Sequence, residues 1–142
     1  MANKTIVNTE WKDNMKFESD IFGHKLIMDA FKNVGGEDLG PPPKPLILSA
    51  LAGCSGIDII MILKKMKIIP EYFNIRIEAE LTEENPKYYN KIKMIYEFSE
   101  NDRKYFDNIE KAINLSEKKY CGVSAQLKCS ADISKEIKFV EI

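Results

Sequence analysis

The sequence predicts a single domain, residues 1–142, that mixes helices with strands. Apolar residues recur at helical spacing between Pro45 and Met66, and a strict alternation of apolar and polar residues marks a strand from Phe73 to Leu81. No linker to a second domain interrupts the chain. Domains cluster at roughly 100 to 150 residues, so a chain of this length is able to bury a core without disulfide bridges.

The segment from Ile6 to Ala30 predicts two or three antiparallel strands. Its apolar side chains stand between polar ones, and a turn falls at Phe22-Gly23-His24. The stretch from Asn33 to Pro43 gathers glycines and three consecutive prolines, which neither a helix interior nor a central strand tolerates. A loop, stiff at its end, therefore follows the first strands.

The helix predicted from Pro45 to Met66 is the central element of the fold. Pro45 suits the first turn, and apolar residues occupy several faces, with Asp58 as the one charged member of the apolar stripe. We therefore expect this helix to be buried nearly all round. Its most apolar run, Ile57 to Leu63, is far shorter than the ~20 residues of a membrane span, so no transmembrane helix is expected.

The second half of the chain predicts a hairpin, a helix and a last strand. Alternation resumes from Ile92 to Phe98, and this strand is expected to pair antiparallel with the one that ends at Leu81. Helical spacing returns from Asp102 to Lys119, with Asp102 as the expected N-cap. A short helix and a strand near Ile133 to Val140 complete the chain.

Charge and composition exclude several classes of function. The chain carries 21 basic and 22 acidic residues, and Arg76 and Arg103 are its only arginines, so a nucleic-acid partner is not expected. The polar first ten residues lack an apolar signal core, which predicts a cytosolic protein. With three cysteines, a structural disulfide framework is not expected. The single histidine, His24, excludes a metal site built on two imidazoles.

Cys54 is the first candidate for chemistry. It lies in the middle of the central helix between Gly53 and Gly56. Glycine costs about 0.5 to 1 kcal/mol relative to alanine in a helix interior, so this pair suggests a close approach by a neighbouring helix or a substrate. The alternative, that Cys54 is a small buried hydrophobic residue, stays open. Asp58 lies on the same side of the helix, where it either orients a group or joins a buried network.

Cys121 is the second candidate. It follows the end of the second long helix, and if another helix begins there, the N-terminal amides stabilise a thiolate and lower the thiol pKa. Cys129 lies near the start of the last strand, and we interpret it as a structural residue. No glycine-rich phosphate-binding motif occurs in the chain.

Two segments together resemble a known family. Pro45–Ile60, which contains Gly53-Cys54-Ser55-Gly56, resembles the central helix of the OsmC/Ohr family, and Lys111–Ser124 resembles its second cysteine motif. Gly23–Ala30 is similar to the N-terminal strands of the OsmC-like branch. The two cysteines stand in the order found in the family, 67 residues apart (121 minus 54), and the resemblance covers nearly the whole chain.

The resemblance implies an α+β fold with antiparallel sheets around long central helices, in which two chains intertwine as a homodimer. It also implies a stress-response thiol peroxidase that reduces organic hydroperoxides. In that mechanism the Cys54 thiolate attacks the peroxide and becomes a sulfenic acid, and Cys121 condenses with it to a disulfide. An external dithiol then restores both thiols. No metal or organic cofactor is implied.

Lys44 joins Asp58 as a candidate substrate-binding residue. Peroxidases of the family carry an activating pair, an arginine in the N-terminal region and a glutamate just before the central helix. Here the N-terminal region has no arginine, and Lys44 stands ten positions before Cys54. Lys44 either supplies positive charge, without the planar fork of arginine, or is a solvated loop residue. Two other readings stay open. One is a redox-sensing or small-molecule-binding protein with an apolar pocket, and the other is that both thiols are structural remnants.

Overall fold

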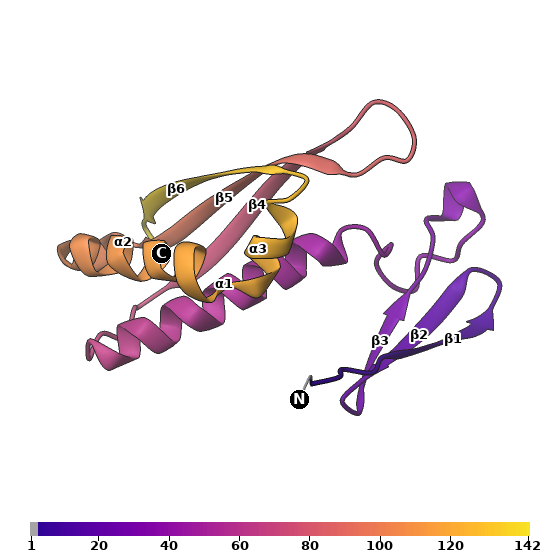
Figure 1. The fold of residues 1–142 in the computed structure, drawn as a ribbon, viewed down its shortest axis with the longest axis horizontal. Coiled ribbons are helices and arrows are strands. Elements are labelled where there is room, and N and C mark those ends of the chain that lie inside the picture. The colour runs from indigo at the N-terminus through magenta and orange to yellow at the C-terminus, as the bar shows by residue number, and fades with distance from the viewer. Residues whose placement is uncertain (1–2) are drawn as a thin grey trace. The chain divides into compact units, whose positions relative to one another are not determined.

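The structure, a computed structural model, describes residues 3–142. They form two compact units that divide between Ile47 and Leu48, and Figure 1 traces both along the chain. Each unit contains one three-stranded sheet, with the strand orders β1-β2-β3 and β4-β5-β6. The expected α+β class is confirmed, and the description as a single domain stays a prediction.

The first unit is an antiparallel meander of β1 (Asn8–Asp13), β2 (Lys16–Ile21) and β3 (His24–Met28). The predicted turn is present, because Ile21 pairs with His24 and only Phe22 and Gly23 lie between them. Both turn residues have positive φ, 51° and 85°, which matches the twist of a two-residue hairpin. The predicted loop follows β3 and contains one short 3-10 helix, Lys32–Val34.

The first unit has no apolar core of its own among its described residues. Its buried residues are Ser19 and Asp29, both polar, and the Asp29 carboxylate accepts N–H groups of the following loop from Ala30, Glu37 and Leu39. Large apolar side chains are exposed instead, including Trp11 at 61% and Phe22 at 79%. A unit this small buries only a limited share of its own surface, and its described residues leave these apolar side chains exposed.

The second unit begins in α1 (Leu46–Lys65) and continues through β4 (Phe73–Leu81) and β5 (Tyr89–Ser99). The remaining elements are the 3-10 helix Glu100–Tyr105, α2 (Phe106–Leu115), the π-helical turn Ser116–Tyr120, α3 (Gly122–Leu127) and β6 (Asp132–Val140). The predicted hairpin is confirmed, since β4 and β5 pair antiparallel with Phe73 opposite Phe98.

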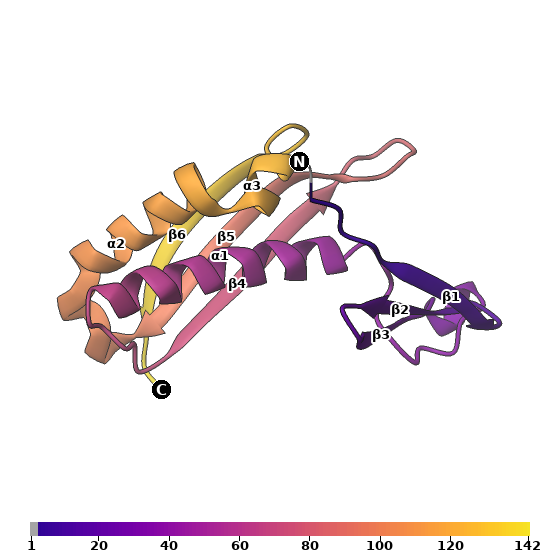
Figure 2. The same ribbon diagram turned by 60° about the horizontal axis from the view of Figure 1, so that its bottom comes forward.

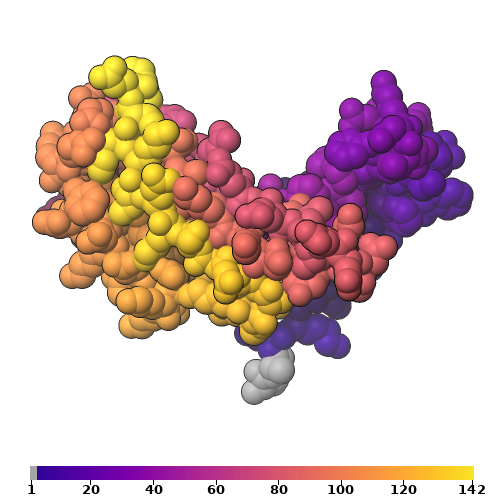
Figure 3. Space-filling view, turned by 90° about the horizontal axis from the view of Figure 1, so that it is seen from above, coloured from indigo at the N-terminus to yellow at the C-terminus, as the bar shows by residue number. Residues whose placement is uncertain are grey.

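The expectation of antiparallel sheets is wrong for β6. This strand pairs parallel with β5, with Lys91 opposite Asp132 and Ser99 opposite Val140. Parallel neighbours need a long crossover, and the helical segment from Glu100 to Leu127 provides it. Strand β6 is an edge strand of its sheet and lies at the surface, where it is yellow in Figure 3.

The core of the second unit lies between its sheet and its helices, which cover one face of the sheet (Figures 1 and 2). Strand β5 supplies the most buried side chains of the sheet, and Phe98 stacks on Phe73 with ring centroids 4.5 Å apart. Helices α1 and α2 add fully buried aliphatic residues, among them Leu51, Ile59, Leu63, Ile109 and Ile113. This packing fixes α1 against the segment that carries Cys121.

Helix α1 is not buried all round, contrary to the expectation. It buries one stripe at every fourth residue, Leu51, Ser55, Ile59 and Leu63. The opposite face stays apolar but exposed, with Ile57 at 64% and Met61 at 55%. When a helix carries apolar residues on several faces, its sequence alone does not show which of those faces the chain itself buries.

By length and composition α1 is also apolar enough to cross a membrane. It has 20 residues and an 18-residue window of mean hydropathy 2.2, 22% of it buried. The length argument from Ile57 to Leu63 therefore understated this helix. One such helix is weak evidence for a span, because core helices of soluble proteins pass the same test. The absence of a membrane partner stays a prediction.

Asp102 is not the N-cap that the sequence predicted. The helical segment starts earlier, and the Ser99 side chain caps it by accepting the Asn101 N–H at 3.1 Å. Asp102 is buried instead, and its carboxylate accepts the Glu71 N–H at 2.8 Å. It therefore ties the loop before β4 to the start of the crossover.

We expect Asp102→Ala to lower the free energy of unfolding by about 1 to 3 kcal/mol, because the Glu71 N–H then loses its partner. Urea unfolding at a fixed protein concentration measures this change. The exposed-site variant Glu110→Ala is the control and is expected to stay within about 0.5 kcal/mol of wild type. An Asp102→Ala protein as stable as that control would contradict the assigned hydrogen bond.

Candidate functional site

Two cysteines and one aspartate meet in the second unit. Cys54 and Asp58 are one turn apart on α1, and Cys121 immediately precedes α3. The two sulfur atoms and a carboxylate oxygen of Asp58 all lie within 4.8 Å of one another. Both thiols are free, Cys54 half-buried and Cys121 buried. The structure therefore brings together three of the four candidate residues predicted from the sequence.

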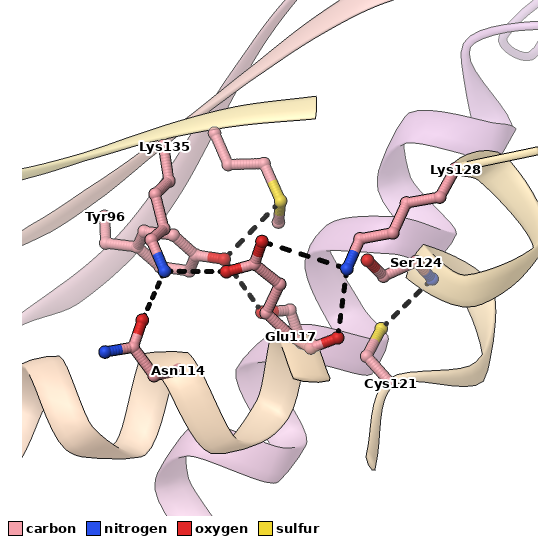
Figure 4. Close-up of polar contacts among 9 residues, drawn as sticks. Tyr96, Asn114, Glu117, Cys121, Ser124, Lys128 and Lys135 are labelled. Carbon is pink, nitrogen blue, oxygen red and sulfur yellow. Dashed lines mark hydrogen bonds and ion pairs between the residues drawn. The ribbon is translucent and has the colours of Figure 1, made fainter. Parts of the chain in front are cut away.

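The backbone around Cys121 explains how its thiol reaches α1. The last turn before it is π-helical, and the Cys121 N–H donates to the Ser116 carbonyl at 2.8 Å, five residues back. Cys121 then leaves the helix in an extended conformation and becomes the N-cap of α3. The Cys121 Sγ accepts the Ser124 N–H at 3.4 Å (Figure 4). A helix thus does begin at Cys121.

The expected lowering of the Cys121 pKa is wrong. The pKa of the Cys121 thiol is raised to about 11, mainly by burial and further by its hydrogen bond with Cys54 and the charges of Cys54 and Asp58. The Ser124 N–H acts in the opposite direction but does not compensate. The hydrogen bond from Ser124 at the start of α3 therefore lowers the thiol pKa by less than desolvation and neighbouring negative charge raise it. At neutral pH Cys121 is a thiol.

We expect the alkylation rate of Cys121 by iodoacetamide to keep rising about tenfold per pH unit from pH 7 to pH 10, because only the thiolate reacts. A free thiol of ordinary pKa, about 8.5, levels off within that range and serves as the reference. Initial rates on the Cys129→Ser protein, mapped by peptide mass spectrometry, measure this. A plateau for Cys121 below pH 9 would contradict the raised pKa.

Asp58 joins a short polar network, one of the two roles expected of it. The Ser116 hydroxyl donates to the Asp58 carboxylate at 3.1 Å and so fixes its orientation beside the thiols. Ser116 is fully buried. Ser116 continues the apolar stripe of α2 one turn after Ile113. A polar residue at such a position was the sequence signal that could have identified it as part of the site.

A second polar cluster lies on the sheet side of Cys121 (Figure 4). Glu117 forms ion pairs with Lys135 at 2.6 Å and with Lys128 at 3.8 Å, and Lys135 also donates to Asn114. Burial opposes ionisation of Glu117, but Lys135 and Lys128 hold its pKa below the usual range. Because both lysines are paired, the cluster offers the thiols little free positive charge.

A cavity of about 10 Å³, room for one water, separates this cluster from Cys121. Tyr96 lines it, and its hydroxyl contacts the Ser55 hydroxyl at 3.2 Å and the Met94 sulfur at 3.4 Å. Burial raises the pKa of Tyr96. The sequence did not identify Tyr96 and Lys135 as residues beside Cys121. The available signal was that Lys135 interrupts the apolar alternation of Ile133 and Ile137 on β6.

An apolar groove of about 570 Å³ lies between α1 and β4. Its lining residues are Ala52, Gly53, Gly56, Ile57, Ile60, Met61, Phe73, Asn74 and Ile75. A β-carbon on Gly56 would stand 3.4 Å from the Ile75 side chain, so the neighbour of Gly56 is strand β4, at ordinary contact distance, and not the helix or substrate that the sequence predicted. A β-carbon on Gly53 would have no atom within 4 Å, and Gly53 lines the groove.

The other sequence candidates lie outside this cluster. Lys44 belongs to the first unit, is exposed, and sits in the turn before α1, where its carbonyl accepts the Ile47 N–H at 3.1 Å. Its role in substrate binding stays a prediction. His24 is exposed beside the β2–β3 turn. Cys129 is exposed and so adds nothing to core packing, contrary to our interpretation of it as structural.

The fold and this cluster define a class of protein, an α+β chain that holds a reduced dithiol between its long central helix and the start of a short one. The chain belongs to the OsmC-like protein family, whose pattern matches residues 35–136. This confirms the resemblance seen in the two cysteine motifs.

Comparison with individual proteins agrees with this assignment. Protein YhfA of Escherichia coli K12 is 29% identical over 132 residues, which cover 92% of this chain and 95% of YhfA. A hypothetical protein from Aquifex aeolicus VF5 has a crystal structure similar to this one, with a TM-score of 0.78 and 29% identity over 99% of this chain and 100% of that one. An organic hydroperoxide resistance protein OsmC from Legionella pneumophila has a TM-score of 0.65 at 20% identity, over 99% of each chain, and shows the fold alone.

Proposed function

We propose that this protein is a cysteine-based thiol peroxidase that reduces organic hydroperoxides through a Cys54–Cys121 disulfide. The observation that carries the proposal is the pair of free thiols within 4.8 Å of each other. Family membership supports it, because the family includes organic hydroperoxide resistance proteins such as the one from Legionella pneumophila.

The two thiols take different roles in this proposal. Cys54 is the attacking thiol, because it is half-buried whereas Cys121 is only 3% exposed and has its pKa raised to about 11. The Cys54 thiolate takes the terminal oxygen of the hydroperoxide, so the O–O bond breaks and an alkoxide leaves, which takes up a proton to become an alcohol. Cys121 then attacks the sulfenic acid at Cys54, which releases water and leaves a disulfide. An external dithiol reduces it by exchange.

The proposal also assigns a homodimer and a cytosolic location. Proteins of this family are typically dimeric. The exposed apolar face of α1, the groove against β4 and the apolar side chains of the first unit all require cover, and a second copy of the chain supplies it. Lys44 supplies positive charge toward the substrate in place of the absent arginine, and Asp58 orients groups at the dithiol.

Peroxide-dependent loss of free thiols tests the proposal. Reduced, metal-free protein is mixed with cumene hydroperoxide or with hydrogen peroxide, and thiol titration and intact mass follow the reaction. We expect rapid loss of two thiols per chain, faster with the organic peroxide, and one Cys54–Cys121 disulfide by peptide mapping. Thiols that persist for hours would overturn it.

A second function is favoured by one observation. Among residues 3–142, no ion pair places a lysine or arginine on the carboxylate beside the dithiol, although a nearby cation is what activates a thiolate. A redox-sensing or small-molecule-binding protein with an apolar groove needs no such activation. Unreactive thiols combined with saturable binding of an apolar ligand would select this alternative.

A further inference from the structure

We propose that Cys54, Cys121 and Asp58 form a binding site for one thiophilic divalent cation, with Zn²⁺ as the best match, in the reduced protein. The proposal goes beyond the peroxidase function and does not depend on it. It rests on the meeting of two sulfur atoms and one carboxylate oxygen within 4.8 Å, contributed by α1 and by the start of α3.

The donor set selects the class of metal. Two thiolates and one carboxylate suit Zn²⁺, whereas Mg²⁺ and Ca²⁺ require six or more oxygen ligands. Around tetrahedral Zn²⁺, with Zn–S distances of about 2.3 Å, ligand atoms stand about 3.5 to 3.8 Å apart. The three atoms, within 4.8 Å of one another, therefore need to approach by about 1.3 Å at most (4.8 minus 3.5), a shift within reach of side-chain rotation. Among the described residues the cluster supplies three ligands, so the fourth position is left for water or another small ligand.

The surrounding residues already orient two of the three ligands. The Ser116 hydroxyl donates to Asp58 at 3.1 Å, and the Ser124 N–H donates to the Cys121 sulfur at 3.4 Å. Hydrogen bonds of this kind fix the direction of ligand lone pairs and are typical of the outer shell of metal sites. Lys128 and Lys135 do not compete for the site, because both pair with Glu117.

Charge also favours a cation at this position. Asp58 is half-buried beside two sulfur atoms, and no ion pair joins it to a lysine or arginine in the described part of the chain. A divalent cation displaces one proton from each thiol and is bound by two thiolates and a carboxylate, which leaves a net charge of −1. The Cys54–Cys121 disulfide and the bound metal exclude each other, because both use the same sulfur lone pairs.

Titration of the full-length, reduced, chelator-treated protein with Zn²⁺ against a chromophoric chelator tests the proposal, with Co²⁺ as the spectroscopic probe. We expect one ion per chain, and for Co²⁺ a thiolate charge-transfer absorption with the intense visible bands of a tetrahedral site. Cys54→Ser and Cys121→Ser are expected to abolish both signals. Cys129→Ser, which removes the exposed third thiol, is the matched control and is expected to bind like wild type.

Asp58→Asn separates this site from simple chelation by two neighbouring thiols. The variant keeps the shape of the side chain, and we expect it to weaken Zn²⁺ binding by about 100-fold, with Ser116→Ala weakening it by about 10-fold. Thermal unfolding of each apo variant verifies that it is folded. Equal affinity in Asp58→Asn and wild type, or binding that depends on Cys129, would overturn the proposal. Because peroxide reduction is measured without metal, failure of either proposal leaves the other standing.

Discussion

Cys54→Ser is expected to slow the reduction of organic hydroperoxides on the order of a thousandfold or more, because a serine hydroxyl is not ionised at neutral pH and does not attack an O–O bond. Cys121 does not replace it, since it is buried and its pKa is raised to about 11. Consumption of cumene hydroperoxide in the presence of a dithiol measures the effect. Oxidation of Cys121 at an undiminished rate in this variant would contradict the assigned roles.

Cys121→Ser is expected to behave differently from Cys54→Ser. The first turnover persists, but the sulfenic acid at Cys54 accumulates and reacts with dimedone, because no second thiol within 4.8 Å condenses with it. Cys129→Ser is the matched control, since it removes an exposed thiol outside the cluster and is expected to turn over normally.

If Lys44 supplies the activating charge, Lys44→Gln slows the first oxidation while Lys44→Arg preserves it.

Local periodicity predicted most of the secondary structure of this chain. Phe73–Leu81 is a strand with the predicted bounds, because one face of it packs on the core and the other meets water. The central helix, predicted from Pro45 to Met66, is observed from Leu46 to Lys65. The pairing of β6 was not predictable in this way, because strand direction depends on the crossover that precedes the strand and not on its own alternation.

The candidate site was predictable in its members but only partly in its electrostatics, since a carboxylate such as Asp58 is expected to raise the pKa of a neighbouring thiol. The two cysteine motifs and the position of Asp58 on the same side of α1 as Cys54 are visible in the sequence. The pKa of Cys121 depends on burial and on groups brought to it from α1, so the helix start alone gave the wrong direction. Ser116 and Lys135 entered the site through tertiary packing, although each is a polar residue in an apolar pattern.

Ile57→Glu is expected to dissociate the proposed homodimer. Ile57 is 64% exposed within the chain and lines the apolar groove with Met61, so a second copy that covers this face would bury the new carboxylate without a partner. An unpaired buried charge costs roughly 3 to 5 kcal/mol, which raises the dissociation constant at least about a hundredfold. Sedimentation velocity over a concentration series measures it, with the exposed variant Glu110→Lys as the charge-changing control.

The same variant distinguishes what one chain supplies to the site from what the dimer supplies. Cys54, Asp58 and Cys121 come from a single chain, so diamide is expected to form the Cys54–Cys121 disulfide in monomeric Ile57→Glu as it does in wild type. Hydroperoxide reduction is expected to fall, because the apolar groove beside α1 then loses the cover that the proposed second copy supplies. Wild type that sediments as a monomer, or an Ile57→Glu protein that stays dimeric, would contradict this interface. Disulfide formation that fails with diamide would instead show that the dithiol itself depends on the second copy.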